Sequence, residues 1–145
     1  TLSATPEERL LGHIPPDLAS GCEFEPPTPP ALAIATCQAD DGRILATYFL
    51  YTDESALNKA YDEFAATSEI ERNSGRCSDR ATWPSEGSYS ISGEPAGRVL
   101  CMDVSDAPTI YWTDTRLLIL ASAFHLDGDA ERLYEFWELE AGPSL

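Results

Sequence analysis

Basic residues are scarce in this chain. Its 145 residues include 9 Lys and Arg against 25 Asp and Glu, so the formal net charge is −16 at neutral pH. Nucleic acids and anionic lipid headgroups are bound mainly through Lys and Arg side chains that neutralise phosphate charge. The composition therefore argues against a nucleic-acid partner and against a peripheral role on an anionic membrane.

Signatures of catalysis are also missing. The chain has two His residues, His13 and His125, with no serine elbow, Cys–His signature or glycine-rich phosphate loop. It has no Cys-x-x-Cys pair and no calcium loop ending in Glu, so we predict no metal site and no cofactor, with a weak surface calcium site as the alternative that the acidic charge leaves open. We expect no catalytic residues. The alternative is a small hydrolase that uses His125 with a carboxylate.

Long apolar runs are absent too. No segment approaches the ~20 apolar residues of a membrane span, and no signal peptide opens the chain. Direct membrane insertion by this segment is therefore not expected. Hydrophobic residues nevertheless make up 43% of the chain, which is enough for a sizeable core. The length predicts a single domain over residues 1–145.

Turn and capping residues divide the chain into short strands and amphipathic helices. The predicted strands cover residues 31–38, 44–51, 97–103, 109–113 and 117–126, and the helices begin after Thr5, Asp53 and Asp129. The polar segment 67–88 is predicted to be a long loop. Strands joined by tight turns, with helices between the hairpins, predict an α+β fold: an antiparallel sheet with helices packed on one face.

The second half of the chain repeats the order of the first. Each residue on the apolar face of the helix after Asp53 has a counterpart 73 residues later, in the last helix. The paired positions are Leu57 with Ala130, Ala60 with Leu133, Tyr61 with Tyr134, and Phe64 with Trp137. We interpret this pattern as a degenerate internal duplication, with halves of about residues 1–67 and 68–145.

The four cysteines are placed alike in the two halves, with one in a loop and one on a strand. Pairing in chain order joins Cys22 to Cys37 and Cys77 to Cys101, with 14 and 23 residues between the partners. Each such link stabilises by about 3 kcal/mol through loop closure. Four cysteines allow three pairings, and free thiols in a cytosolic protein are the alternative. The even count and matched placement favour two disulfides and an oxidising compartment.

Four aromatic residues of the second half are candidates for a ligand surface: Trp83, Tyr89, Tyr111 and Trp112. Successive strand residues point to opposite faces, so Tyr111 and Trp112 cannot both enter the same core. One of the two is expected on the solvent face, where half-exposed aromatic rings bind ligands. Packing of these rings beneath the loop 67–88 is the alternative, and it is the one that we favour.

A set of short motifs is spread over nearly the whole chain. In the first half these are Leu10-Leu11, His13-Ile14-Pro15, Cys22, the Ala-rich strand ending at Cys37, and Tyr61. In the second half they are Gly93, the strand from Ala96-Gly97-Arg98 to Cys101, Trp112-Thr113-Asp114, Asp127-Gly128, Leu133-Tyr134 and Trp137. Together these motifs resemble a small domain of actinobacterial exported proteins, notably the part of receptor-like Ser/Thr protein kinases beyond the membrane span.

This resemblance implies a non-catalytic sensor module on the outer face of the cell membrane or in a secreted protein. Its partner would be an extracellular ligand or protein of unknown identity. Kinase motifs are absent from the chain, so any phosphotransfer would belong to a separate cytosolic segment. The parent protein can be a kinase, a lipoprotein or a secreted protein, and a structural spacer without a ligand is a further alternative.

Overall fold

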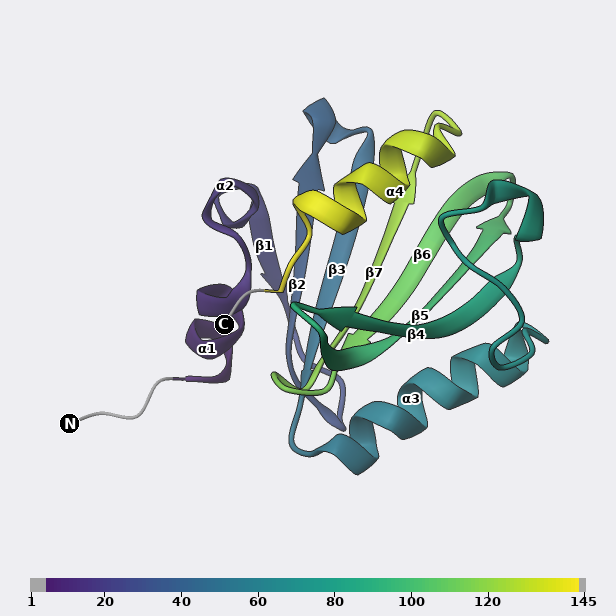
Figure 1. Cartoon of the computed structure of the whole chain (residues 1–145). Helices are drawn as coiled ribbons and strands as arrows, with labels where there is room; N and C mark the ends of the chain where they lie inside the picture. The colour runs from purple at the N-terminus through teal and green to yellow at the C-terminus, as the bar shows by residue number, and fades with distance from the viewer. Residues whose placement is uncertain (1–4, 144–145) are drawn as a thin grey trace.

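The computed structural model describes residues 5–143, which are organised around one antiparallel sheet of seven strands (Figure 1). The strand order is β1-β2-β3-β7-β6-β5-β4. The strands are β1 (Cys22–Glu25), β2 (Ala31–Ala39), β3 (Ile44–Tyr51), β4 (Ser85–Ile91), β5 (Glu94–Val104), β6 (Ala107–Asp114) and β7 (Ile119–His125). The antiparallel α+β fold is confirmed. Residues 1–4 and 144–145 of the predicted single domain lie outside the described residues.

Three of the four α-helices within residues 5–143 begin where their capping residues predict, and the exception, the short helix at Pro16–Ala19, has no side-chain cap. They are α1 (Pro6–His13), α2 (Pro16–Ala19), α3 (Glu54–Thr67) and α4 (Ala130–Leu139), with the short 3-10 helices η1 (Asp40–Gly42) and η2 (Arg80–Thr82). The side chains of Thr5, Asp53 and Asp129 accept hydrogen bonds from backbone N–H groups in the first turns of α1, α3 and α4. Within residues 5–143, no helix has the length and apolar composition that a membrane span requires.

Helices cover both faces of the sheet, so the expectation of a single covered face is wrong. One face, here called the α4 face, packs against α1, α2 and α4 through residues such as Tyr48 and Trp112. The other, the α3 face, packs against α3 through residues such as Ile34 and Leu120. The physical reason lies in strands such as β3, whose residues are apolar at both alternating sets of positions. Such strands require cover on both sides.

The segment 67–88 is only partly a loop. Its last residues form the start of β4, the strand at one edge of the sheet, whose Ser85 lies opposite Cys101 of β5. The composition of β4 does not predict a strand, because β4 consists mainly of Ser, Glu and Gly rather than β-branched residues. Backbone pairing with β5 forms the strand despite its low intrinsic preference.

The positions of α3 and α4 do not fit a two-fold symmetric arrangement of the two predicted halves. Tyr48 of β3 pairs directly with Ala121 of β7, its counterpart in the repeat. A two-fold axis that exchanges these antiparallel strands stands perpendicular to the sheet and keeps each element on its own face. Because α3 and α4 lie on opposite faces, no such axis relates the complete halves. The duplication stays a prediction from the sequence.

Both disulfides form in the predicted chain order. Cys22–Cys37 joins the edge strand β1 to β2, at residues that lie opposite each other in the sheet. Cys77–Cys101 joins the loop before β4 to the buried part of β5. No cysteine in the described residues is free. One link thus reinforces the pairing of the short edge strand β1 with β2, and the other fastens the loop before β4 to the sheet.

Burial keeps the tyrosines neutral. Desolvation raises the pKa of all six of them, most strongly for Tyr48, Tyr61 and Tyr89. A raised pKa in the folded state stabilises the fold below the unfolded pKa of about 10, and this stability is lost as the pH rises above it.

We therefore expect these three tyrosines to ionise only as the protein unfolds in alkali. The absorbance of tyrosinate and the circular dichroism should change in one common step above pH ~10, whereas the denatured chain should titrate near pH 10. Full ionisation of all six tyrosines with an unchanged circular dichroism spectrum would contradict the burial described above.

Gly97 of β5 marks a point of close approach between two strands. A Cβ atom placed there would overlap the Thr113 carbonyl oxygen and would lie 2.7 Å from Thr113 Oγ1. We expect Gly97→Ala to destabilise the fold by about 3 kcal/mol, because the backbone of β5 or β6 must move. The matched control is Gly12→Ala, where the new methyl group meets no atom within 4 Å. Equal denaturation midpoints for the two variants would contradict this packing.

Candidate functional site

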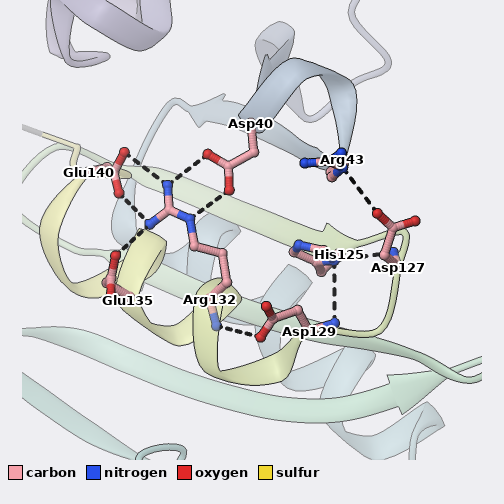
Figure 2. Close-up of polar contacts among 8 residues, drawn as sticks. All are labelled: Asp40, Arg43, His125, Asp127, Asp129, Arg132, Glu135 and Glu140. Atoms are coloured by element: carbon pink, nitrogen blue, oxygen red, sulfur yellow. Dashed lines mark hydrogen bonds and ion pairs between the residues drawn. The ribbon is translucent and has the colours of Figure 1, made fainter.

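His125 lies at the end of β7, where the chain turns into α4 (Figure 2). Its ring is buried, with 4% of the residue exposed. Its Nδ1 atom accepts hydrogen bonds from the backbone N–H groups of Asp127 (3.1 Å) and Asp129 (3.3 Å). The ring thus satisfies two backbone donors ahead of the helix. This arrangement offers no support for a base that meets a substrate, which the hydrolase alternative requires.

Arg132 of α4 gathers carboxylates from both halves of the chain, as Figure 2 shows. Its Nε and Nη2 donate to the two oxygens of Asp40 at 2.6 and 2.8 Å, and its Nη1 donates to Glu135 and Glu140 at 2.9 and 2.6 Å. The hydrogen bonds from Arg132 lower the pKa of Asp40 against the opposing effect of burial. Asp40 is therefore ionised and bonded to Arg132, which ties η1 to α4.

Asp40 and Asp41 form part of the turn between β2 and β3. Both adopt left-handed backbone angles, with φ values of 52° and 55°.

Within residues 5–143, no group of three or more His, Cys, Asp or Glu side chains is arranged to hold a metal ion. The pairing of Asp40 with Arg132 is not predictable from local sequence patterns, because the two residues are 92 positions apart.

The four aromatic residues singled out from the sequence do not form one surface. Trp112 is completely buried on the α4 face, with 0% of the residue exposed. Trp83 and Tyr89 are partly buried against the same core, where Trp83 Nε1 donates to the Cys77 carbonyl (2.9 Å) and Tyr89 Oη donates to the Thr113 carbonyl (2.6 Å). Trp112 and Tyr89 pack edge-on against Trp137 of α4, so these rings belong to the core beneath α4 and do not form a shared ligand surface.

Tyr111 is the exception among these rings. As the alternation along β6 predicts, it points to the face opposite Trp112, where it packs with the α3 cluster. Its ring stacks on that of Phe64 from α3, with centroids 3.7 Å apart and planes inclined by 23°. The expected solvent face is therefore partly covered by a helix. Tyr111 remains half-buried there.

An open groove lies beside this stacked pair, between α3 and strands β3, β7 and β6. Its volume is about 730 Å³, within the range of small-molecule sites. Its aromatic lining consists of Phe49, Tyr51, Phe64, Tyr111 and Phe124. Three strands and one helix thus contribute rings to one concave surface. We call this surface the aromatic groove.

Polar groups of the aromatic groove are mostly neutral. Thr47, Ser105, Thr109 and Ser122 supply hydroxyl groups, and Glu63 of α3 is the one charged residue among those that line it. Desolvation raises the pKa of the two lining tyrosines, Tyr51 and Tyr111, so both carry neutral hydroxyl groups at physiological pH. The groove combines apolar ring faces, hydroxyl groups and a single carboxylate.

Of the rings in the aromatic groove, only Tyr111 is among the candidate ligand residues predicted from the sequence. Phe49 and Phe124 come from strands that are far apart in the sequence and adjacent in the sheet order β3-β7-β6. The available signal was the large apolar residues at alternate positions of β3 and β7, which Thr47 and Ser122 interrupt. Without the strand order, that register does not identify a common surface.

Comparisons with known proteins give no relative: no family model, no curated protein and no solved structure matches the chain. The resemblance to the outer domains of receptor-like kinases therefore stays a prediction.

Proposed function

We propose that this chain is a non-catalytic module outside the cytoplasm that binds a ligand or a protein through the aromatic groove. In this proposal it is the sensor part of a membrane-anchored protein, such as a receptor-like Ser/Thr kinase. The observation that carries the proposal is the aromatic groove itself, an open concavity of about 730 Å³ lined by five aromatic rings. Binding sites are typically concave, mostly apolar and supplied with a few polar groups.

The two disulfides support the proposed location. Disulfides persist in secreted proteins and on cell surfaces, and are rare where thiols are kept reduced. One link joins β1 to β2, and the other joins the loop before β4 to β5. An oxidising compartment is therefore the setting in which the described fold gains the stability of both links.

A test of the proposal is binding of Nile red, an uncharged apolar dye that fluoresces in apolar surroundings. We expect the native protein to raise its fluorescence saturably. Thr47→Phe should remove most of this signal, because Thr47 lines the aromatic groove and a larger ring would fill it. The control is Ser88→Phe on the exposed surface of β4. Both variants are first checked for an unchanged circular dichroism spectrum.

Two results would count against a binding role for the aromatic groove. One is the absence of saturable dye binding to the native protein, which would favour a structural spacer. The other is an equal signal from the native protein and from Thr47→Phe, which would place the dye elsewhere.

A further inference from the structure

We propose that the aromatic groove selects an amphipathic organic cation, a small molecule with an apolar body and an ammonium head. This inference rests on the proposed function, because it concerns the same site, and it adds the chemical class of the ligand. Three features carry it: the ring faces of the groove, the lone carboxylate of Glu63, and the absence of a basic residue from the lining.

The ring faces provide both apolar contact and attraction for a positive charge. An aromatic ring carries partial negative charge on its faces, so a cation above the ring is attracted to it. Phe49, Phe64, Tyr111 and Phe124 line the groove from three strands and one helix. The apolar body of a ligand would gain from burial against these rings, and a cationic head would gain from their faces in addition.

Glu63 adds a full negative charge to the lining. It is exposed on α3, next to Phe64 in the chain, and the ion pairs formed within residues 5–143 do not involve it. Lys59, one turn earlier on α3, lines a neighbouring depression that Glu63 also borders, but it does not line the aromatic groove and forms no ion pair with Glu63 within the described residues. The carboxylate is therefore available to a cationic head.

The charge of the whole chain acts in the same direction. Its net charge of −16 attracts cations over a distance set by the ionic strength and repels anions. An anionic ligand of the same apolar body would meet this repulsion with no Lys or Arg in the lining to offset it. A neutral ligand would gain only from apolar burial. Charge complementarity thus ranks the cation first, the neutral compound second and the anion last.

The test compares three compounds that share one apolar chain: decyltrimethylammonium, decyl maltoside and decyl sulfate, each below its micelle concentration. In calorimetric titrations of the native disulfide-bonded protein, we expect the cation to bind about 3- to 10-fold more tightly than the neutral compound. Glu63→Gln should abolish most of this preference and leave the affinity for decyl maltoside unchanged.

Two controls separate the groove from the general charge of the chain. Glu54→Gln removes the same charge from the same helix, at an exposed position outside the groove lining, and should keep the preference. Thr47→Phe, which fills the groove, should weaken both the cation and the neutral compound. The inference is overturned if Glu54→Gln and Glu63→Gln lower the cation affinity equally, because general electrostatics would then suffice.

The outcomes also separate this inference from the proposed function. Equal affinity for the cation and the neutral compound, with both lost in Thr47→Phe, would overturn the cation preference and leave the groove as a binding site. Failure of all three compounds to bind the native protein would overturn both. Tightest binding of decyl sulfate would overturn the cation preference directly.

Discussion

Reduction of both disulfides is expected to lower the free energy of unfolding by about 6 kcal/mol, an effect comparable to the whole stability of many domains of this size. The two links close segments with sequence separations of 15 and 24. Loop-closure entropy assigns about 3 kcal/mol to each of them, with the larger share for the longer segment. The reduced chain should therefore be largely unfolded at physiological temperature.

Paired substitutions distinguish the two links without a reductant. Replacing Cys77 and Cys101 by Ala should cost more than replacing Cys22 and Cys37 by Ala. The Cys77–Cys101 link also holds the loop whose Cys77 carbonyl accepts the hydrogen bond from Trp83 Nε1. The Cys22–Cys37 link fastens only the short strand β1. Urea denaturation followed by tryptophan fluorescence measures the free energy of unfolding of the two double variants. An oxidised protein and a reduced protein with the same midpoint would contradict the expected stabilisation.

Arg98→Met is expected to destabilise the fold by about 3–5 kcal/mol, because it leaves a buried carboxylate without its partner. Glu86, whose side chain is 2% exposed, accepts hydrogen bonds from Arg98 Nε at 2.6 Å and from Arg98 Nη2 at 2.8 Å. Tyr61 Oη and the Asn73 backbone N–H also donate to this carboxylate, at 2.7 and 2.9 Å. The loss of Arg98 removes the only positive charge among these groups.

Acid should weaken the same cluster. Burial opposes the ionisation of Glu86, but the hydrogen bonds from Arg98, Asn73 and Tyr61 together outweigh it and lower the pKa. A lowered pKa in the folded state contributes stability above the unfolded pKa of about 4.3, and this contribution is lost as the pH falls below it. Stability should therefore fall below pH ~4 in the native protein.

Two controls define the result for Arg98. Arg80→Met removes an Arg that also makes a two-point contact with a carboxylate, on Asp103, but the side chains are 49% and 41% exposed. We expect a loss below about 1 kcal/mol there. The double variant Glu86→Leu with Arg98→Met should recover much of the stability lost in Arg98→Met. A loss for Arg98→Met as small as that for Arg80→Met would contradict the role assigned to the buried pair.

Local patterns predict much of the fold correctly. The hairpin of β2 and β3 follows from apolar runs on either side of Asp40-Asp41-Gly42, and the starts of α1, α3 and α4 follow from their capping residues. These features depend on interactions between residues a few positions apart. The disulfide pairing also follows chain order, because each link closes a segment within one half.

The features that the sequence does not predict arise from contacts between distant segments. The face that a helix covers is one example, since α3 and α4 have similar apolar faces and pack on opposite sides of the sheet. The edge strand β4 is another, because it depends on β5 for its pairing. The aromatic groove combines both, as it requires the strand order and the position of α3.

The pairing of β3 with β7 at the middle of the sheet has a further consequence for how the molecule can be divided. Neither disulfide crosses from the segment before residue 68 to the segment after it, since one joins residues 22 and 37 and the other joins residues 77 and 101. Cleavage after the exposed Arg72 would therefore leave two pieces with no covalent bond between them. They would be held together by the β3–β7 pairing, by their shared core and by the contact of Arg132 with Asp40. The chain is thus laid out as a natural pair of complementing fragments, each carrying its own internal crosslink.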